Sequence, residues 1–501
     1  MRRTLAVAIV ALAVALTTVP GSASETGPTG PLVAIDGSAE LALSKALRIL
    51  DPEPRDPAPD HASEVFRELF ESLPELEGEE RVLAQQILAR PTDGARDPRG
   101  HGYTTRSVKD CTRTACLHWV RTTSDAPPND AWAQKSLSVL NRVYRFEVGQ
   151  LGYRRPVPDG RHGGNSKFDV YLKHLGPGFY GYCVPEYYKP GSRRVASGYC
   201  VIDNDFSRQD YRGRPVANLQ VTLAHEFFHA VQFAYDFTDD PWIYESTAVW
   251  MEERFADKVN DSRQYLRVGQ VRLPHIPLDT FDEPGTHYGN WVWWEYLSKR
   301  FGNGIVRQVW SRLDANEGEP NMYSTEGLRS TLRSRGGFTK LFAAYAGANT
   351  VPAKFYPEGE HWPSAMLAGG DVLGTSDRRA RFGTRVDHMA SRNFVVKPDS
   401  TLRGGWKLRI KVNGPSRSSA PAAYLIVRKK SGEVERHAIT LTRKGLGKAK
   451  VGFSGRRVTS VTVTVANAST RFDCRRRTSY SCRGVARDDD RRFVVEASVF
   501  R

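Results

Sequence analysis

After position 19, this 501-residue sequence contains no apolar run long enough to cross a membrane, which excludes a protein with many membrane spans. It also lacks a regular glycine repeat, and it is not short of apolar residues, since 40% of its positions are hydrophobic and 26% are charged. These proportions exclude a collagen-like or disordered chain and supply enough apolar side chains for two or three domains.

A basic excess is missing from most of the chain. The formal net charge is +16, but residues 401–501 hold 24 Lys and Arg against 7 Asp and Glu, which leaves 48 against 49 for residues 1–400. The basic character therefore belongs to the C-terminal fifth alone. Because this fifth has no motif of mixed basic and aromatic residues, a nucleic acid is not an expected partner.

A single apolar run stands near the N-terminus. Arg2 and Arg3 precede the uncharged segment 5–19, and small residues follow at 21–24. This order is typical of a secretory signal peptide, residues 1–24, with cleavage near Ala23 or Ser24. A helix of about 15 residues rises only about 22 Å, which is too short for a membrane anchor. We therefore expect a secreted, extracellular protein whose mature chain has no transmembrane segment.

Cysteine is scarce but even in number, since the sequence contains six. In an oxidising compartment, six cysteines favour structural disulfides. Proximity in the sequence favours three local pairs: Cys111 with Cys116, Cys183 with Cys200, and Cys474 with Cys482. A cysteine-rich zinc site is disfavoured, because the first pair alone has a suitable spacing and no second such pair completes a site.

The order of patterns predicts four regions after the signal. Residues 25–100 have apolar positions at helical spacing and are interpreted as a helical N-terminal region or a propeptide. Residues 101–350 mix β-like runs with longer helices, which is typical of an α+β fold. Residues 351–389 are rich in Gly, Pro, Ser and Thr and predict a linker. Residues 390–501 consist of short β-rich runs between turn residues, which predicts a basic, all-β sandwich domain.

The segment 221–234, VTLAHEFFHAVQFA, contains the residues that could bind a metal ion and catalyse a reaction. Its apolar residues recur at helical spacing and predict a buried helix. His225 and His229 are four positions apart, so both imidazoles lie on one face of that helix and can bind one metal ion. Glu226 lies beside the first histidine, where its carboxylate can lie next to a metal-bound water rather than on the metal. Burying two such histidines without a partner would be costly, which disfavours a purely structural role.

A catalytic zinc ion takes three protein ligands and leaves one position open, so a third ligand is required. Residues 242–255 predict a second helix after the turn at 238–241. Glu245, near the start of this helix, is the first candidate for the third ligand. Glu252 and Glu253 are rivals from later turns of the same helix.

The motif HEFFH at 225–229, followed by WIYESTA at 242–248, resembles the gluzincin group of zinc metallopeptidases, and most of all uncharacterised secreted bacterial metallopeptidases of that group. The resemblance implies a zincin-like catalytic domain that acts on a peptide or protein substrate. By the same resemblance, His225, His229 and Glu245 would bind Zn2+, and Glu226 would be the general base. The fifteen residues between His229 and Glu245 are slightly fewer than in the best-known gluzincins, so the turn must be tight.

In the zinc aminopeptidases of this group, a tyrosine shortly before a glycine helps to stabilise the tetrahedral intermediate. The resemblance places Thr286 at that position, beside His287 and Tyr288, and either neighbour could donate a hydrogen bond to a developing oxyanion. Packing at the start of a helix is the alternative role for both. The GxMEN strand of those aminopeptidases has no counterpart before His225, which favours an endopeptidase. We expect residues 198–203 to form an edge strand along which an extended peptide could pair.

A rival hypothesis assigns the function to the C-terminal region. In it, the chain is an exported cell-surface or polyanion-binding protein with a catalytically silent zincin-like domain. The basic sandwich would then bind an anionic cell-wall polymer. A charged surface that keeps an exported domain soluble explains the same composition equally well.

Overall fold

The structure is a computed structural model, and it describes residues 38–50, 61–93, 102–281, 285–476 and 478–501. The predicted signal peptide, 1–24, lies outside the described residues. The N-terminal region is helical in its described residues, as predicted, and forms three helices: α1 (Ser38–Leu50), α2 (Ala62–Ser72) and α3 (Gly78–Ile87). None of the helices in these described ranges is both long enough and apolar enough to cross a bilayer.

A five-stranded sheet follows, with the strand order β1-β2-β3-β5-β4. Its central pairs, β2 with β3 and β3 with β5, are parallel, whereas the outer pairs are antiparallel. The prediction that residues 198–203 form an edge strand is wrong, because β5 is paired on both sides and β4 lies outside it. The strands are β1 (Val108–Cys111), β2 (Ala115–Trp119), β3 (Phe168–Lys173), β4 (Gly181–Tyr188) and β5 (Ala196–Asp203).

Helices make up the rest of this part of the chain, and the predicted α+β class is confirmed. The long helix α5 (Pro215–Asp236) packs on β4 and β5 and is buried over most of its length, which explains its apolar sequence. The π-helix η3 (Arg145–Gln150) extends α4. The other helices are α4 (Asp130–Tyr144), α6 (Pro241–Ala256), α7 (Thr286–Gly289), α8 (Trp291–Phe301), α9 (Gly304–Leu313), α10 (Ser324–Leu332) and α11 (Phe338–Ala348).

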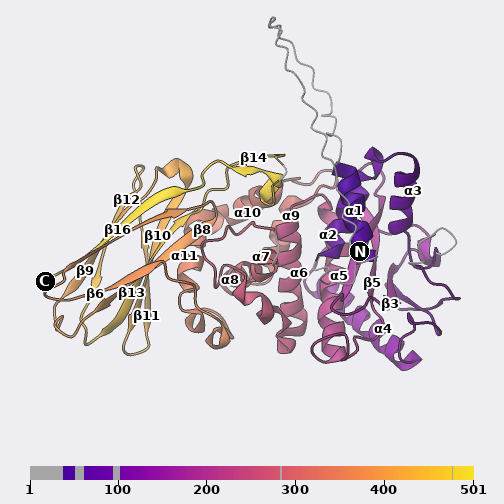
Figure 1. The fold of residues 1–501 in the computed structure, drawn as a ribbon, viewed down its shortest axis with the longest axis horizontal. Helices are drawn as coiled ribbons and strands as arrows, with labels where there is room; N and C mark the ends of the chain where they lie inside the picture. Colours follow the sequence, from indigo (N-terminus) through magenta and orange to yellow (C-terminus); the bar gives the residue numbers. More distant parts are fainter. Residues whose placement is uncertain (1–37, 51–60, 94–101, 282–284, 477) are drawn as a thin grey trace, which may run out of the picture.

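One hydrophobic core joins the N-terminal helices to the sheet and to α5. Phe66 and Leu69 of α2 are fully buried in the same cluster as Leu117 and Val201 of the sheet and Phe228 of α5. In Figure 1 the indigo helix α2 accordingly lies against the sheet, where it packs on β4, and α1 packs on α2. The described residues 38–50 and 61–93 are thus packed into the body of this part of the structure.

The C-terminal strands form two sheets around a second core, which contains Leu408, Val461 and Phe493. One sheet has the order β11-β10-β13-β8-β6 and the other β12-β9-β16-β7. Residues 369–386, expected within the linker 351–389, instead form β6 and β7. The strands are β6 (Gly369–Leu373), β7 (Arg379–Val386), β8 (Ala390–Pro398), β9 (Lys407–Asn413), β10 (Pro421–Lys429), β11 (Val434–Ile439), β12 (Leu446–Gly452), β13 (Val458–Asn467), β14 (Phe472–Asp473), β15 (Val485–Ala486) and β16 (Arg491–Phe500).

The sandwich is joined to the helices by buried polar contacts. His388 lies between two carboxylates, with its Nε2 3.0 Å from Asp279 Oδ1 and its Nδ1 2.5 Å from Asp489 Oδ1. The amide of Cys482 donates to Asp240, the residue just before α6, over 2.8 Å. A residue of the C-terminal part therefore bonds to the start of a helix that carries a predicted metal ligand.

All six cysteines pair as predicted from their proximity, which fits an oxidising compartment. The Cys183–Cys200 disulfide joins β4 to β5 at paired positions of the sheet, and it ties the edge strand to its neighbour. The three disulfides are Cys111–Cys116, Cys183–Cys200 and Cys474–Cys482.

Candidate metal centre

Helices α5 and α6 bring the three predicted ligands together. The two helices pack against each other after the tight turn at 237–240, in accord with the short spacing of the motif. His225 and His229 lie one turn apart on α5, and Glu245 faces them from α6. One ligand atom from each of the three residues lies within 4.8 Å of the other two. This cluster could hold a metal ion.

Hydrogen bonds at the second ring nitrogen orient both imidazoles. His225 donates from Nδ1 to Glu252 Oε1 over 2.6 Å. The Gln232 amide group donates to the Tyr244 carbonyl over 2.9 Å, so its Oε1 is left to accept from His229 Nδ1 at 2.7 Å. Each histidine therefore keeps Nε2 for a ligand, an arrangement that carboxylates and carbonyls commonly impose on metal-binding histidines.

The two Nε2 atoms converge on one carboxylate oxygen. Glu245 Oε2 lies 3.1 Å from His225 Nε2 and 3.7 Å from His229 Nε2. His229 is 1% exposed, and its Nε2 has no hydrogen-bond partner. A buried polar atom without such a partner is costly, whereas a cation among these three donors would satisfy it.

The electrostatics of the cluster also suit a cation. Burial lowers the pKa of His229 to about 4, so its ring is neutral at pH 7. Burial alone would raise the pKa of Glu245, but His229 and His225 outweigh it and lower that pKa to about 2. Burial likewise opposes the charged form of His225, yet the bonds to Glu245 and Glu252 raise its pKa well above the usual value. The cluster thus contains an ionised carboxylate between a neutral imidazole, His229, and a protonated one, His225, whose Nε2 proton a metal ion would replace.

Glu226 is placed beside this cluster and near the edge strand. It is 6% exposed, and burial raises the pKa of its carboxyl group to about 7. A carboxyl group with such a pKa suits a general base at neutral pH. Gly181, at the start of β4, makes room for Glu226, because a Cβ on that glycine would lie only 3.1 Å from Glu226 Cγ.

The two rival glutamates have other partners. Glu252 orients His225, as described above, and burial raises the pKa of its carboxyl group to about 7. Glu253 accepts a hydrogen bond from Ser262 over 2.7 Å and is not part of the cluster. Glu245 is therefore the carboxylate that the fold places against both histidines.

The two residues suggested for oxyanion stabilisation lie close to the cluster. His287 is fully buried and stacks on Phe281 at 4.3 Å between ring centroids. Burial lowers the pKa of His287 to about 3, although the charge of Glu245 opposes this, and neither ring nitrogen has a hydrogen-bond partner. The ring centroid of Tyr288 lies 6.2 Å from that of His225. Both residues are buried beside the cluster.

Two features of the site do not follow from the motif. Glu147, on the π-helix η3, is fully buried with both carboxylate oxygens unpartnered, and burial raises its pKa well above the usual value. Glu147 follows Val143 by four residues and so continues the buried face of α4, and this helical spacing could have been recognised in the sequence. Ser63 of α2 donates to Glu226 over 3.0 Å, and no sequence signal connects these two residues.

Residues 213–325 match a family of unknown function. The family is described as DUF6055, and the matched segment holds every site residue from His225 to Tyr288. No curated protein matches the chain. The family match therefore covers the candidate metal centre but adds no activity to it.

Three solved structures show slight similarity to this chain. One is Aeromonas hydrophila PliG, a periplasmic inhibitor of g-type lysozyme, at 11% identity and a TM-score of 0.16, covering 26% of this chain and 96% of PliG. The copper-binding surface protein CorA of Methylomicrobium album BG8 gives the same identity and score over 26% of this chain and all of CorA. A GH115 glucuronidase, BtGH115A, matches at 9% identity and a TM-score of 0.14, covering 70% of this chain and 54% of the glucuronidase. Scores this low carry no information about the site.

Proposed function

We propose that this protein is a secreted zinc-dependent endopeptidase of the gluzincin type. One observation carries the proposal: His225 Nε2, His229 Nε2 and a Glu245 oxygen converge within 4.8 Å, while the other ring nitrogens are held by Glu252 and Gln232. Two imidazoles and one carboxylate form the ligand set of catalytic zinc in several peptidases. The three disulfides fit export.

Zinc would supply Lewis acidity at the scissile carbonyl when bound. Glu226 takes a proton from the attacking water and returns it to the leaving amine, for which a pKa of about 7 is suitable. His287 or Tyr288 donates a hydrogen bond to the oxygen on which negative charge develops. β4 is the edge strand beside Glu226, and an extended substrate would pair with its outward backbone groups, which α2 covers in this structure.

The test compares the full chain with its Glu226→Gln variant on a library of unstructured peptides. Because Glu226 and two of the ligands are buried, products are collected over many hours at high protein concentration. We expect products from the parent chain alone, lost on adding a chelator, with equal zinc content in both proteins. Equal product formation by parent and variant would remove the peptidase assignment.

A second candidate function is binding of an anionic polymer by the sandwich. The observation that favours it is a cavity of about 760 Å³ at one end of the sandwich, whose lining includes Lys407, Lys429, Lys430, Arg456 and Arg457. Such a basic surface attracts polyanions in a salt-dependent manner. The test is salt-dependent retention of the full chain on an immobilised polyanion, which Lys430→Glu with Arg457→Glu should weaken. Unchanged retention of this double variant would show that this cavity is not the polyanion-binding site.

A further inference from the structure

Helix α2 of the N-terminal region lies directly over the proposed general base. The amide of Cys183 donates to Ser63 Oγ over 2.8 Å, and this hydroxyl in turn donates to Glu226 Oε2 over 3.0 Å. Because the oxygen of Ser63 accepts from the amide, its proton is available for the carboxylate. Ser63 thus connects the outer edge of β4 to Glu226.

Both partners of Ser63 are groups that a peptide substrate would use. Cys183 lies on β4, an edge strand, and its amide points away from β5 toward α2. An extended peptide that adds to a sheet pairs with such outward backbone groups. Glu226 must receive its hydrogen bond from the attacking water. In this structure the Ser63 hydroxyl bonds to both groups, so it occupies the position of the peptide carbonyl at Cys183 and that of the water at Glu226.

Helix α2 is anchored by charged and aromatic contacts. Arg67 donates to the carbonyls of Phe237 and Asp239 over 2.5 and 2.6 Å, and it also pairs with Glu64. Its guanidinium lies 4.4 Å from the ring centroid of Tyr244, the residue before the ligand Glu245. The anchor of α2 is therefore built on the segment that joins the two metal-ligand helices.

The apolar face of α2 packs on the same strand. Phe66 contacts Tyr182, and Phe70 contacts Tyr188, each with ring centroids 4.8 Å apart. With α2 in place, Glu226 is only 6% exposed and Glu245 only 1%. A polypeptide substrate has no access to either carboxylate until this helix moves.

We propose that α2 is an autoinhibitory helix that occupies the substrate position of the candidate metal centre. This inference rests on the proposed peptidase function. Displacement of α2 frees the Cys183 amide and Glu226 together, and it opens the ligands to solvent and substrate. The N-terminal region then acts as an intramolecular competitor of the substrate.

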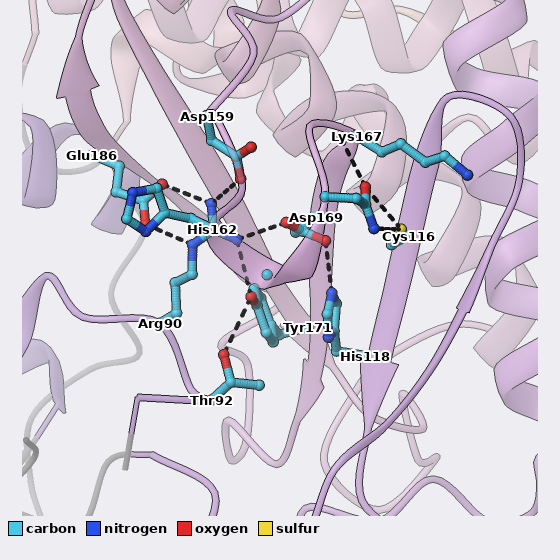
Figure 2. Close-up of polar contacts among 12 residues, drawn as sticks. Arg90, Thr92, Cys116, His118, Asp159, His162, Lys167, Asp169, Tyr171 and Glu186 are labelled. Carbon is cyan, nitrogen blue, oxygen red and sulfur yellow. Dashed lines mark hydrogen bonds and ion pairs between the residues drawn. The ribbon is translucent and has the colours of Figure 1, made fainter. Parts of the chain in front are cut away.

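The chain offers a boundary at which α2 can be separated. Glu77 and Gly78 are exposed, and no heavy atom would touch a Cβ at the glycine. Beyond this point, Arg90 is 2% exposed and binds three carboxylates, which Figure 2 shows around its guanidinium. A cut before Gly78 leaves that buried ion cluster intact, whereas loss of residues up to 93 would leave it without its cation.

The test places a site for a specific protease between Glu77 and Gly78 of the full chain. Two quantities are measured before and after cutting and dilution: peptide hydrolysis, and the rate at which a chelator extracts zinc. We expect both to rise by at least about tenfold, since the site is closed in the intact chain. A synthetic peptide of residues 62–77 should reverse both, and its Ser63→Ala form should inhibit about fivefold less well because it lacks one hydrogen-bonding group.

Variants of the intact chain test the same proposal if the cut protein does not stay folded. Arg67→Lys keeps the charge but lacks the second nitrogen, Nη2, that pairs with Glu64 while Nη1 bonds the two carbonyls, so it should raise both rates. Lys45→Ala removes an exposed ion pair between α1 and α2 and should leave them unchanged. Unchanged hydrolysis and zinc extraction after cutting and in Arg67→Lys would overturn the autoinhibition. If zinc extraction becomes faster but no Glu226-dependent hydrolysis appears, α2 does close the site. That result would overturn the peptidase function.

Discussion

Removing Arg90 should destabilise the chain strongly. Its guanidinium lies 2.5 Å from Asp159, 2.6 Å from Asp169 and 2.6 Å from Glu186, and its side chain is 1% exposed (Figure 2). His118 makes a further contact of 2.6 Å with Asp169. In Arg90→Met, three buried carboxylates would face one another without their main cation. Breaking a buried ion pair in this way costs about 3–5 kcal/mol.

The size of this loss should depend on pH. Burial raises the pKa of Asp159 to about 6 even though Arg90 lowers it, so removing Arg90 raises it further. Below about pH 6 the folded variant binds protons that the unfolded chain does not yet bind, and these protons reduce the repulsion among the three carboxylates. The destabilisation by Arg90→Met should therefore be larger at pH 8 than at pH 5.

Urea unfolding followed by tryptophan fluorescence measures the effect, since nine of the ten tryptophans precede the sandwich. The control is Arg121→Met, which removes an ion pair whose side chains are 63% and 58% exposed. This control should cost less than about 1 kcal/mol. If Arg90→Met costs no more than the control at pH 8, the buried cluster does not hold the N-terminal region in place.

Two further changes test other contacts. Glu252→Ala removes the acceptor that orients His225, so zinc affinity by calorimetric titration should fall by about 10-fold or more, and an unchanged affinity would contradict this role. Burial disfavours charged His388, yet Asp279 and Asp489 raise its pKa to about 10. The stability from this contact is complete below about pH 6.5 and is lost as the pH rises toward 10. His388→Gln should thus flatten the decline of the melting temperature over that range, and an unchanged slope would argue against the contact.

Local patterns in the sequence predict much of the fold and the cluster itself. The spacing of His225 and His229 fixes a shared helical face, and Glu245 follows on the next helix after a short turn. The alternating burial of β9 and the burial of most of α5 likewise follow from residue spacing. These features depend on neighbours within a few turns of one element.

Features that depend on distant pairing were missed. Residues 198–203 have the composition of a strand, but the addition of β4 outside them depends on how distant segments pair. One miss was local: in β7, residues 379–386, exposed positions alternate with less exposed ones, so this strand could have been predicted from its own sequence instead of a linker. The contact of Ser63 with Glu226 joins positions 163 residues apart, and only the three-dimensional fold brings them together.

Zinc titration of the chelator-treated full chain tests the metal centre most directly. We expect one zinc ion per chain for the parent protein, as for a three-ligand catalytic site. His229→Ala and Glu245→Gln should each lose this binding, whereas Glu253→Gln, on the same helix but outside the cluster, should keep it. Parent protein that binds no zinc, or ligand variants that bind zinc as tightly as the parent, would contradict the proposed metal centre.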